Sequence, residues 1–141
     1  MNITTIAGPY LRIFIPLSAL ADTLTQYKNT FDAVVDFHFH NPHPAAEVYQ
    51  LSSSMGLFCI FASDEQQPEI IKHTIATYSV KDLDRLLWEA ENNGFEIPQP
   101  KTAVGAGFQA RIKLADKQYI ELVEWHAPFV KKLLPKYAAE E

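Results

Sequence analysis

The side chains with the clearest potential for chemistry are two histidines at alternate positions, His38 and His40, which follow Asp36 in the segment AVVDFHFH. At this spacing we expect all three side chains to lie on one face of a β-strand, where the imidazoles could bind a metal ion together. The same alternation is the ordinary pattern of a strand with one face in water. The sequence leaves both interpretations open and favours the second.

The single cysteine, Cys59, lies in the apolar segment GLFCIFA. One cysteine cannot form an internal disulfide, which favours a reducing compartment. We expect Cys59 to be a small buried side chain rather than a nucleophile. The sequence shows neither a signal-peptide pattern nor an apolar run of roughly 20 residues that would cross a membrane. We therefore expect a cytoplasmic protein with no membrane partner.

Composition narrows the class of protein further. The 141 residues are 48 % hydrophobic and 21 % charged, with a net charge of −5, which is typical of one soluble globular domain. No basic stripe is present to bind phosphates, so a nucleic-acid partner is not expected. The acidic balance is compatible with a cationic small molecule.

The elements that must position these side chains occur twice in one order: strand, helix, strand, strand, strand. Alternating apolar segments predict the strands, and apolar residues spaced three and four apart predict the helices. The second helix carries Leu83, Leu86, Leu87 and Ala90 on one face, and Gly94 can adopt the left-handed conformation that ends it. The expected ranges are 11–17, 18–31, 33–40, 47–52 and 56–62, then 74–80, 82–92, 95–100, 108–114 and 119–125.

This repeat predicts an α+β fold of two tandem βαβββ units, whose curved mixed sheets surround a shared cleft. Each helix would cover one face of its own sheet and leave the other face to the cleft. We place the first unit at 1–66, the second at 67–126 and a C-terminal helical tail at 127–141, all within one structural domain. Trp88 lies away from the apolar stripe of its helix, at an interface or against the tail.

The chain resembles the vicinal oxygen chelate superfamily, which includes glyoxalase I, bleomycin-resistance proteins, fosfomycin-resistance proteins and extradiol dioxygenases, and the resemblance is most specific in the second half. The resemblance covers about residues 11–125. It rests on VKDLDRLLWEAENNGFEI followed by YIELVEW, which is similar to the family's helix and last strand. The family's turn before that strand, Asp-Pro-Asp-Gly, is replaced here by Leu-Ala-Asp-Lys.

In metal-dependent members of this family, four strand positions supply the ligands. The resemblance places them here at Arg12, near Ile60, near Ile75 and at Glu121. Only Glu121 suits a divalent cation, because arginine stays protonated and isoleucine has no donor atom. The resemblance therefore implies a protein without a metal or other cofactor.

Two further arrangements follow from these positions. Arg12 and Glu121 could form a buried ion pair in place of the metal, or each could meet solvent at a strand end. A shift of register could instead bring in His73, and the fallback metal set would then be His73, Glu121 and His38. No catalytic residue is expected, and Glu121 is the candidate base if there is one.

Alternation from Glu121 predicts which side chains line the cleft. Tyr119, Val123 and Trp125 share its face, Phe14 shares a face with Arg12, and Phe58 shares one with Ile60. These side chains either form a pocket for a ligand or fill the cleft completely. The predicted ligand-binding set is Arg12, Phe14, Phe58, Ile60, Ile75, Tyr119, Glu121, Trp125 and His38.

The resemblance thus implies a homodimer that is similar to the bleomycin-resistance branch and binds a small aromatic or cationic molecule without chemistry. The alternative is a metal-dependent lyase, isomerase or dioxygenase of the glyoxalase type. A purely structural interaction module is a third possibility, which no particular residue supports.

Overall fold

The computed structural model describes residues 5–42, 44–105 and 107–126. It divides the chain into an N-terminal unit, Pro9–Lys72, and a C-terminal unit, which joins Met1–Gly8 to His73–Glu141. The first strand is therefore divided at Gly8. The sequence had placed residues 1–8 in the first unit and 67–72 in the second.

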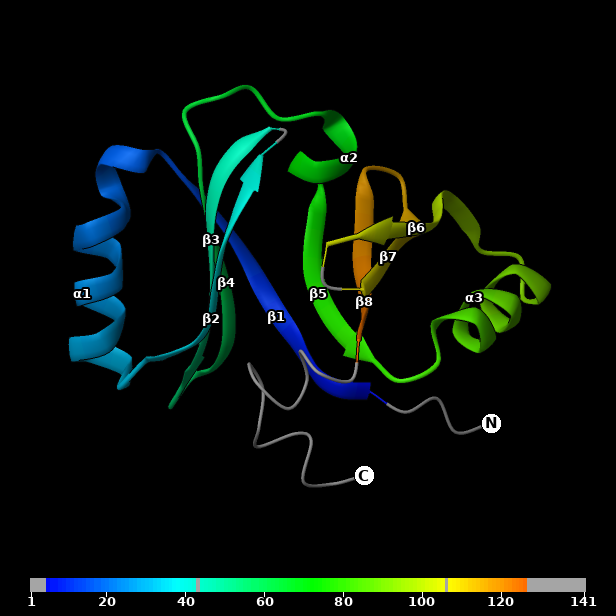
Figure 1. The fold of residues 1–141 in the computed structure, drawn as a ribbon, viewed down its shortest axis with the longest axis horizontal. Helices are drawn as coiled ribbons and strands as arrows, with labels where there is room; N and C mark the ends of the chain where they lie inside the picture. Colours follow the sequence, from blue (N-terminus) through cyan, green and yellow to red (C-terminus); the bar gives the residue numbers. More distant parts are fainter. Residues whose placement is uncertain (1–4, 43, 106, 127–141) are drawn as a thin grey trace. The chain divides into compact units, whose positions relative to one another are not determined.

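In the N-terminal unit, the strands are ordered β2-β3-β4-β1, and β1 and β4 run parallel. The helix α1 lies along one face of this sheet (Figure 1). It packs there through Tyr27 and Phe31, whose rings contact Phe58. The elements of this half are β1 (Thr5–Ile15), a 3-10 turn (Leu17–Ala19), α1 (Leu20–Phe31), β2 (Val34–Pro42), β3 (Ala45–Ser53), β4 (Gly56–Ala62) and a short α2 (Glu69–Lys72).

The C-terminal unit repeats this order, with strands β5-β8-β7-β6 and a parallel pair formed by β5 and β8. The helix α3 lies beside this sheet (Figure 1). The elements are β5 (Thr74–Val80), α3 (Leu83–Asn92), β6 (Glu96–Val104), β7 (Gly107–Ala115) and β8 (Gln118–Trp125). The predicted α+β class and both βαβββ units are confirmed, while the cleft that the units would share stays a prediction.

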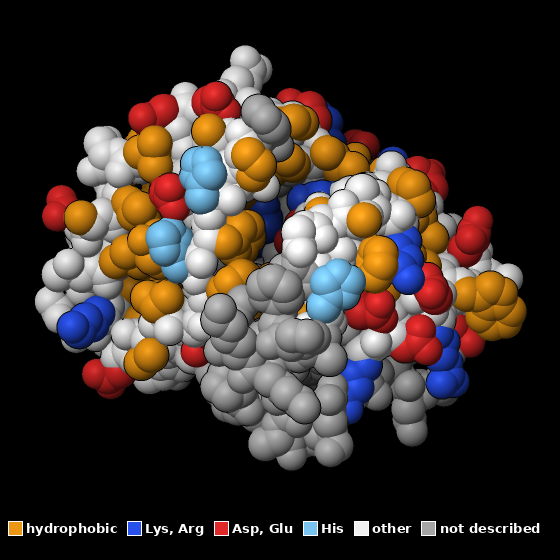
Figure 2. Space-filling model, in the orientation of Figure 1, with side chains coloured by type: hydrophobic (Ala, Val, Ile, Leu, Met, Phe, Trp, Pro, Cys, Tyr) orange, Lys and Arg blue, Asp and Glu red, His pale blue; other side chains and the backbone are white. Residues whose placement is uncertain are grey.

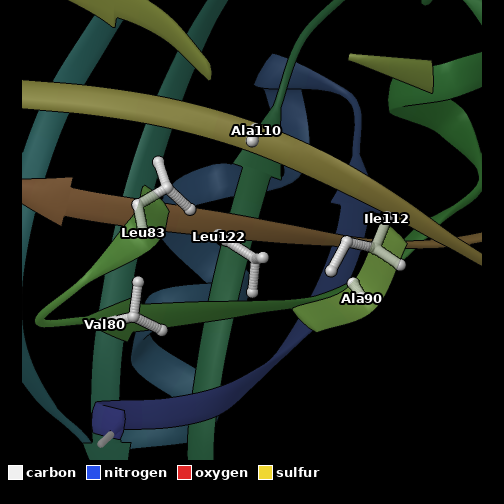
Figure 3. Packing of buried hydrophobic residues seen from close by; sticks show 6 residues of the cluster. All are labelled: Val80, Leu83, Ala90, Ala110, Ile112 and Leu122. Carbon is white, nitrogen blue, oxygen red and sulfur yellow. The ribbon is translucent and has the colours of Figure 1, made fainter. Parts of the chain in front are cut away.

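The core of the C-terminal unit lies between α3 and its sheet (Figure 3). Because strand side chains alternate, Leu122 and Ile120 both point toward the helix, and Glu121 between them points away. Burial of this cluster supplies the main favourable free energy for docking the helix. Its buried members are Val80, Leu83, Ala90, Ala110, Ile112 and Leu122.

The ends of α3 explain why the helix stops where it does. The carboxylate of Asp82 accepts a hydrogen bond from the backbone amide of Arg85, at 3.1 Å, which caps the first turn. At the other end, Gly94 has a φ of +88°, and the amide of Phe95 bonds back to the carbonyl of Ala90 at 2.9 Å. The predicted glycine termination is therefore confirmed.

Two β-bulges change which face several side chains occupy. One interrupts the pairing of β2 between Val35 and Phe37, and the other interrupts β5 between Thr74 and Ala76. An extra residue in one strand reverses the alternation beyond it. Predictions that counted alternate positions through Asp36 or Ile75 are therefore wrong.

The distribution of basic side chains on the surface agrees with the lack of a basic stripe in the sequence. On the face in Figure 2, the side chains of Lys and Arg are scattered among acidic and hydrophobic ones rather than gathered into a patch. Within the described ranges, no helix is both long and apolar enough to cross a membrane. The predicted tail at 127–141 lies outside the described residues.

Candidate functional site

The carboxylate of Glu121 is the centre of a polar network on the sheet face opposite α3. The strand register aligns Thr77, Glu121 and Arg111 across β5, β8 and β7. Thr77 Oγ1 donates to Glu121 Oε1 at 3.0 Å, and Arg111 Nη2 donates to Oε2 at 2.9 Å. Gln109 Nε2 donates to the same Oε2 at 2.5 Å. Both carboxylate oxygens therefore accept hydrogen bonds within the unit.

The guanidinium of Arg111, like the carboxylate of Glu121, makes further hydrogen bonds to polar side chains of the same unit. Its Nε donates to Thr74 Oγ1 at 3.0 Å, and its Nη1 donates to Gln99 Oε1. The side chains of Arg111 and Glu121 are only 6 % and 11 % exposed. A buried ion pair with additional hydrogen bonds of this kind offsets the cost of removing both charges from water.

Arg111 was not among the predicted site residues, although the alternating segment FQARIKL placed it on a strand. Its role depends on the pairing of β7 with β8, which the sequence does not state. The predicted pair between Arg12 and Glu121 involves residues of different units and stays a prediction.

The bulge in β5 displaces Ile75 from the position predicted for it. Ile75 is 42 % exposed, whereas Thr74 and Thr77 on either side of the bulge are almost fully buried and bind the network. The strand alternation predicted through Ile75 is therefore wrong, while its role in ligand binding stays a prediction. His73 precedes the strand, and its backbone carbonyl accepts from the amide of Tyr119 at 3.1 Å.

At the far end of β8, Trp125 extends the same polar face. Its indole Nε1 donates to Ser79 Oγ at 3.0 Å, and Ser79 pairs with Val123 across β5 and β8. Tyr119 lies two residues before Glu121 and is half-buried. The predicted positions Tyr119, Glu121 and Trp125 thus occur on one continuous strand, as alternation required.

In the N-terminal unit, the corresponding face carries Arg12 between aromatic rings. The parallel register pairs Arg12 with Cys59 and Phe14 with Phe61. The guanidinium carbon of Arg12 lies 5.3 Å from the ring centroid of Phe14 and 5.4 Å from that of Phe61. These distances are within the range of cation–π attraction. Arg12 and Phe14 therefore share a face, as predicted.

Phe58 and Ile60 lie on the opposite face, so their predicted place beside Arg12 is wrong. Phe58 packs against α1, with its ring 5.1 Å from that of Tyr27. Ile60 is two residues further along the same strand and is fully buried. The positions beside Arg12 and Phe14 belong instead to Cys59 and Phe61, because the register differs by one residue from the expected one. Cys59 is buried, as predicted.

The histidine pair also falls on the α1 side of its sheet, because His38 pairs with Tyr49 and Tyr49 pairs with Ile60. The carboxylate of Glu47 binds His38 Nε2 at 2.7 Å and His40 Nδ1 at 3.1 Å. These hydrogen bonds, that from His38 first, lower the pKa of the Glu47 carboxyl from its ordinary value of 4.5.

His38 does not share a face with Arg12, and its predicted role in ligand binding stays a prediction. Asp36, which was expected to lie with the histidines, is turned by the bulge toward Tyr10 and Ser52, whose hydroxyls both donate to it. Among the described residues, no group of three His, Cys, Asp or Glu side chains is placed to hold a metal ion.

A hollow of about 400 Å³ opens beside the rings of Phe14 and Phe61, within the N-terminal unit. The segment after β4 supplies its polar atoms, through Asp64 and Gln67. This segment is a polar run with a proline, a pattern that is typical of a loop and carries no signal for a binding site. The hollow is lined by Phe14, Ile15, Pro16, Phe61, Ser63, Asp64 and Gln67.

Neither a protein-family model nor a curated protein matches this chain. Solved structures do. An uncharacterized protein from Methanosarcina mazei is 24 % identical, with a TM-score of 0.68 over 90 % of this chain and 96 % of that one. Methylmalonyl-CoA epimerase from Mycobacterium tuberculosis is 16 % identical, with a TM-score of 0.65 over 89 % and 93 %.

A variant of the Streptomyces coelicolor methylmalonyl-CoA epimerase, bound to 2-nitronate-propionyl-CoA, is similar at 17 % identity, with a TM-score of 0.63 over 88 % of this chain and 99 % of that one. At these identities the likeness shows the fold. The chain has the vicinal oxygen chelate fold that the sequence resemblance implied.

Proposed function

We propose that this protein binds a small organic molecule and does so without a divalent metal ion. One observation carries the proposal. Among the predicted ligand positions, only Glu121 has a side chain that suits a cation, and it already accepts hydrogen bonds from Thr77, Gln109 and Arg111. A metal ion at Glu121 would be repelled by the guanidinium of Arg111, a permanent cation that lies 2.9 Å from the carboxylate.

The other positions give a donor set that does not fit the family's metal. Strand pairing aligns Arg12 with Cys59, and Thr77 with Glu121. Catalytic zinc sites use three His, Cys or carboxylate ligands, whereas the first pair offers a guanidinium and a thiol, and the second offers a neutral hydroxyl and a carboxylate. Base catalysis by Glu121 would likewise compete with the three donors that its carboxylate already binds.

Metal analysis of untagged, purified protein tests the first half of the proposal. We expect Zn²⁺, Ni²⁺, Mn²⁺ and Fe²⁺ to be far below one ion per chain, and unchanged in Glu121→Gln. A stoichiometric metal in the wild type that is lost in Glu121→Gln would overturn the proposal and favour a metal-dependent lyase, isomerase or dioxygenase.

A thermal-shift screen of metal-free protein tests the second half. The screen holds aromatic amines, aromatic carboxylates and methylmalonyl-CoA, the last because epimerases acting on it have this fold. A ligand at a hundred times its Kd stabilises the folded state by about 2.7 kcal/mol. We expect stabilisation by an organic compound without added metal. Stabilisation only when metal and compound are added together would contradict the proposal.

We also expect a homodimer, and sedimentation equilibrium measures it directly. Large apolar side chains that are well exposed supply area for a second copy; they include Val34, Met55 and Trp88, at 63 %, 68 % and 64 %. A protein that remains monomeric at micromolar concentration would contradict this expectation. The cytoplasmic location stays a prediction.

A further inference from the structure

The hollow of the N-terminal unit lies where two parallel strands end together. The strands β1 and β4 run side by side, so their carboxyl ends, near Phe14 and Phe61, meet at one edge of the sheet. The chain then turns away, through Pro16 on one side and Ser63 on the other. A volume of about 400 Å³ is within the range of small-molecule sites.

Two of the polar side chains that line this hollow, Asp64 and Gln67, are held in position by hydrogen bonds. Asp64 Oδ1 accepts from the amide of Leu17 at 3.1 Å, which anchors the carboxylate. Gln67 Nε2 donates to Ser63 Oγ at 3.0 Å and to the carbonyl of Glu65 at 2.9 Å. These two bonds determine the orientation of the Gln67 amide, because only its nitrogen can donate.

These bonds use the amide nitrogen of Gln67 and leave its carbonyl oxygen as an acceptor. Gln67 Oε1 is buried, and no hydrogen-bond donor among the described residues reaches it. A buried acceptor that lacks a donor costs free energy, and a ligand that carries an N–H or O–H would remove that cost. Together with the Asp64 carboxylate, this oxygen selects a ligand that donates hydrogen bonds and carries positive charge.

The apolar wall and the local charge select the rest of the ligand. The rings of Phe14 and Phe61 lie 5.4 Å apart and offer area to an apolar group. Arg12 already lies over both rings, so the positive group of a ligand is expected at the Asp64 side and its apolar group at the rings. The N-terminal unit holds seven acidic and three basic side chains, and this net negative charge attracts a cation.

We infer that this hollow binds a small organic ammonium ion that has at least one N–H and an apolar or aromatic body. The ammonium would donate to Gln67 Oε1 and to the Asp64 carboxylate, and the body would lie against Phe14 and Phe61. This inference rests on the proposed function and names the class of its ligand. It predicts discrimination against anions, neutral isosteres and quaternary ammonium ions without N–H groups.

Calorimetric titration of wild-type protein with 2-phenylethylamine, its N,N,N-trimethyl derivative, 2-phenylethanol and phenylacetate tests the inference. We expect the primary amine to bind most tightly, about tenfold or more tighter than the trimethyl compound and the alcohol, because each loses a charge-assisted hydrogen bond or the charge itself. Phenylacetate should not bind measurably. Equal affinity for the amine and the alcohol, or no binding of the amine, would overturn the inference.

Two variants locate the binding at this hollow. Asp64→Asn keeps the acceptor for Leu17 but removes the charge, and we expect about a tenfold weaker Kd for the amine. Gln67→Leu removes the acceptor, and we expect a loss of about fivefold or more. Asp22→Asn and Gln66→Leu change the same groups at exposed positions outside the hollow and should bind like the wild type.

Backbone amide NMR spectra of each variant verify folding, and the shifts that the amine causes should map to Phe14, Phe61 and residues 63–67. Shifts elsewhere, or unchanged affinity in both folded variants, would refute the site. If metal-free protein binds a different class of molecule in the screen, the proposed function stands and this inference fails. A stoichiometric metal at Glu121 would remove the proposed function itself.

Discussion

The two units repeat one order of elements but use the sheet face opposite their helices in different ways. In the C-terminal unit, this face carries Arg111 and Glu121, which bind each other and four neighbouring polar side chains within the same sheet and are almost fully buried. In the N-terminal unit, the corresponding face carries Arg12 over the rings of Phe14 and Phe61, next to an open hollow.

The two units also differ in net charge. The N-terminal unit carries four of the five net negative charges, whereas the C-terminal unit is close to neutral. The charged side chains Arg111 and Glu121 of the C-terminal unit thus lie in a hydrogen-bonded network, whereas the N-terminal unit has acceptors and aromatic rings beside a hollow. A repeated scaffold therefore does not repeat its chemistry, because the side chains at equivalent strand positions differ.

The largest effect should come from breaking the ion pair of the C-terminal unit. Glu121→Leu leaves the buried guanidinium of Arg111 without its carboxylate, and we expect the free energy of unfolding to fall by about 3–5 kcal/mol. The double variant Glu121→Leu/Arg111→Met should recover most of that loss. Urea unfolding measures both. A single variant that loses under 1 kcal/mol would mean that the pair behaves as a surface ion pair.

A smaller effect should separate two glycines that both have positive φ. Gly8 has a φ of +129°, and a Cβ there would lie 3.0 Å from the carbonyl oxygen of Thr77 and 3.0 Å from Cδ1 of Tyr78. Gly56 has a φ of +110° with nothing within 4 Å of such a Cβ. We expect Gly56→Ala to cost about 1 kcal/mol of unfolding free energy, and Gly8→Ala about 2–3 kcal/mol.

The difference in unfolding free energy between these two variants tests whether β1 is divided at Gly8. If residues up to Gly8 pack with β5, only Gly8→Ala meets both backbone strain and close contact. Equal losses in urea unfolding would indicate that Gly8 does not approach Thr77, and that the N-terminal residues do not belong with the C-terminal unit.

The smallest effect concerns the exposed carboxyl of Glu47. Since hydrogen bonds from His38 and His40 lower its pKa in the folded state, its contribution to stability is complete above the ordinary value of 4.5. That contribution is lost as the pH falls through the lowered pKa. In an NMR titration we expect the Glu47 midpoint below 4.5, and a rise in His38→Ala that exceeds the rise in His40→Ala. A midpoint that neither variant moves would contradict the hydrogen bonds.

Regular segments of the chain could be predicted well. The stripe of Leu83 and Ala90 marked the buried side of α3, and alternation from Glu121 placed Leu122 against that helix. Both predictions succeed because helix and strand periodicities are local properties that persist along an uninterrupted element.

Predictions failed where pairing between distant segments decided the outcome. The bulges at Asp36 and Ile75 reversed the expected alternation, and the parallel pairing of β1 with β4 put Phe61, rather than Phe58, beside Phe14. A bulge depends on the partner strand as much as on the residue that it displaces. Asp64 and Gln67 gave no signal at all, because nothing periodic surrounds them.

The sequence by itself determined the order of elements, the repeat of one βαβββ unit, the fold family and the single carboxylate at a predicted ligand position. Tertiary structure alone decided what that carboxylate does: Arg111 and Gln109 come from β7 and Thr77 from β5, the two strands that pair with β8. It also decided where a hollow lies. Local periodicity depends on neighbouring residues, whereas register and strand ends depend on hydrogen bonds between segments far apart in the chain.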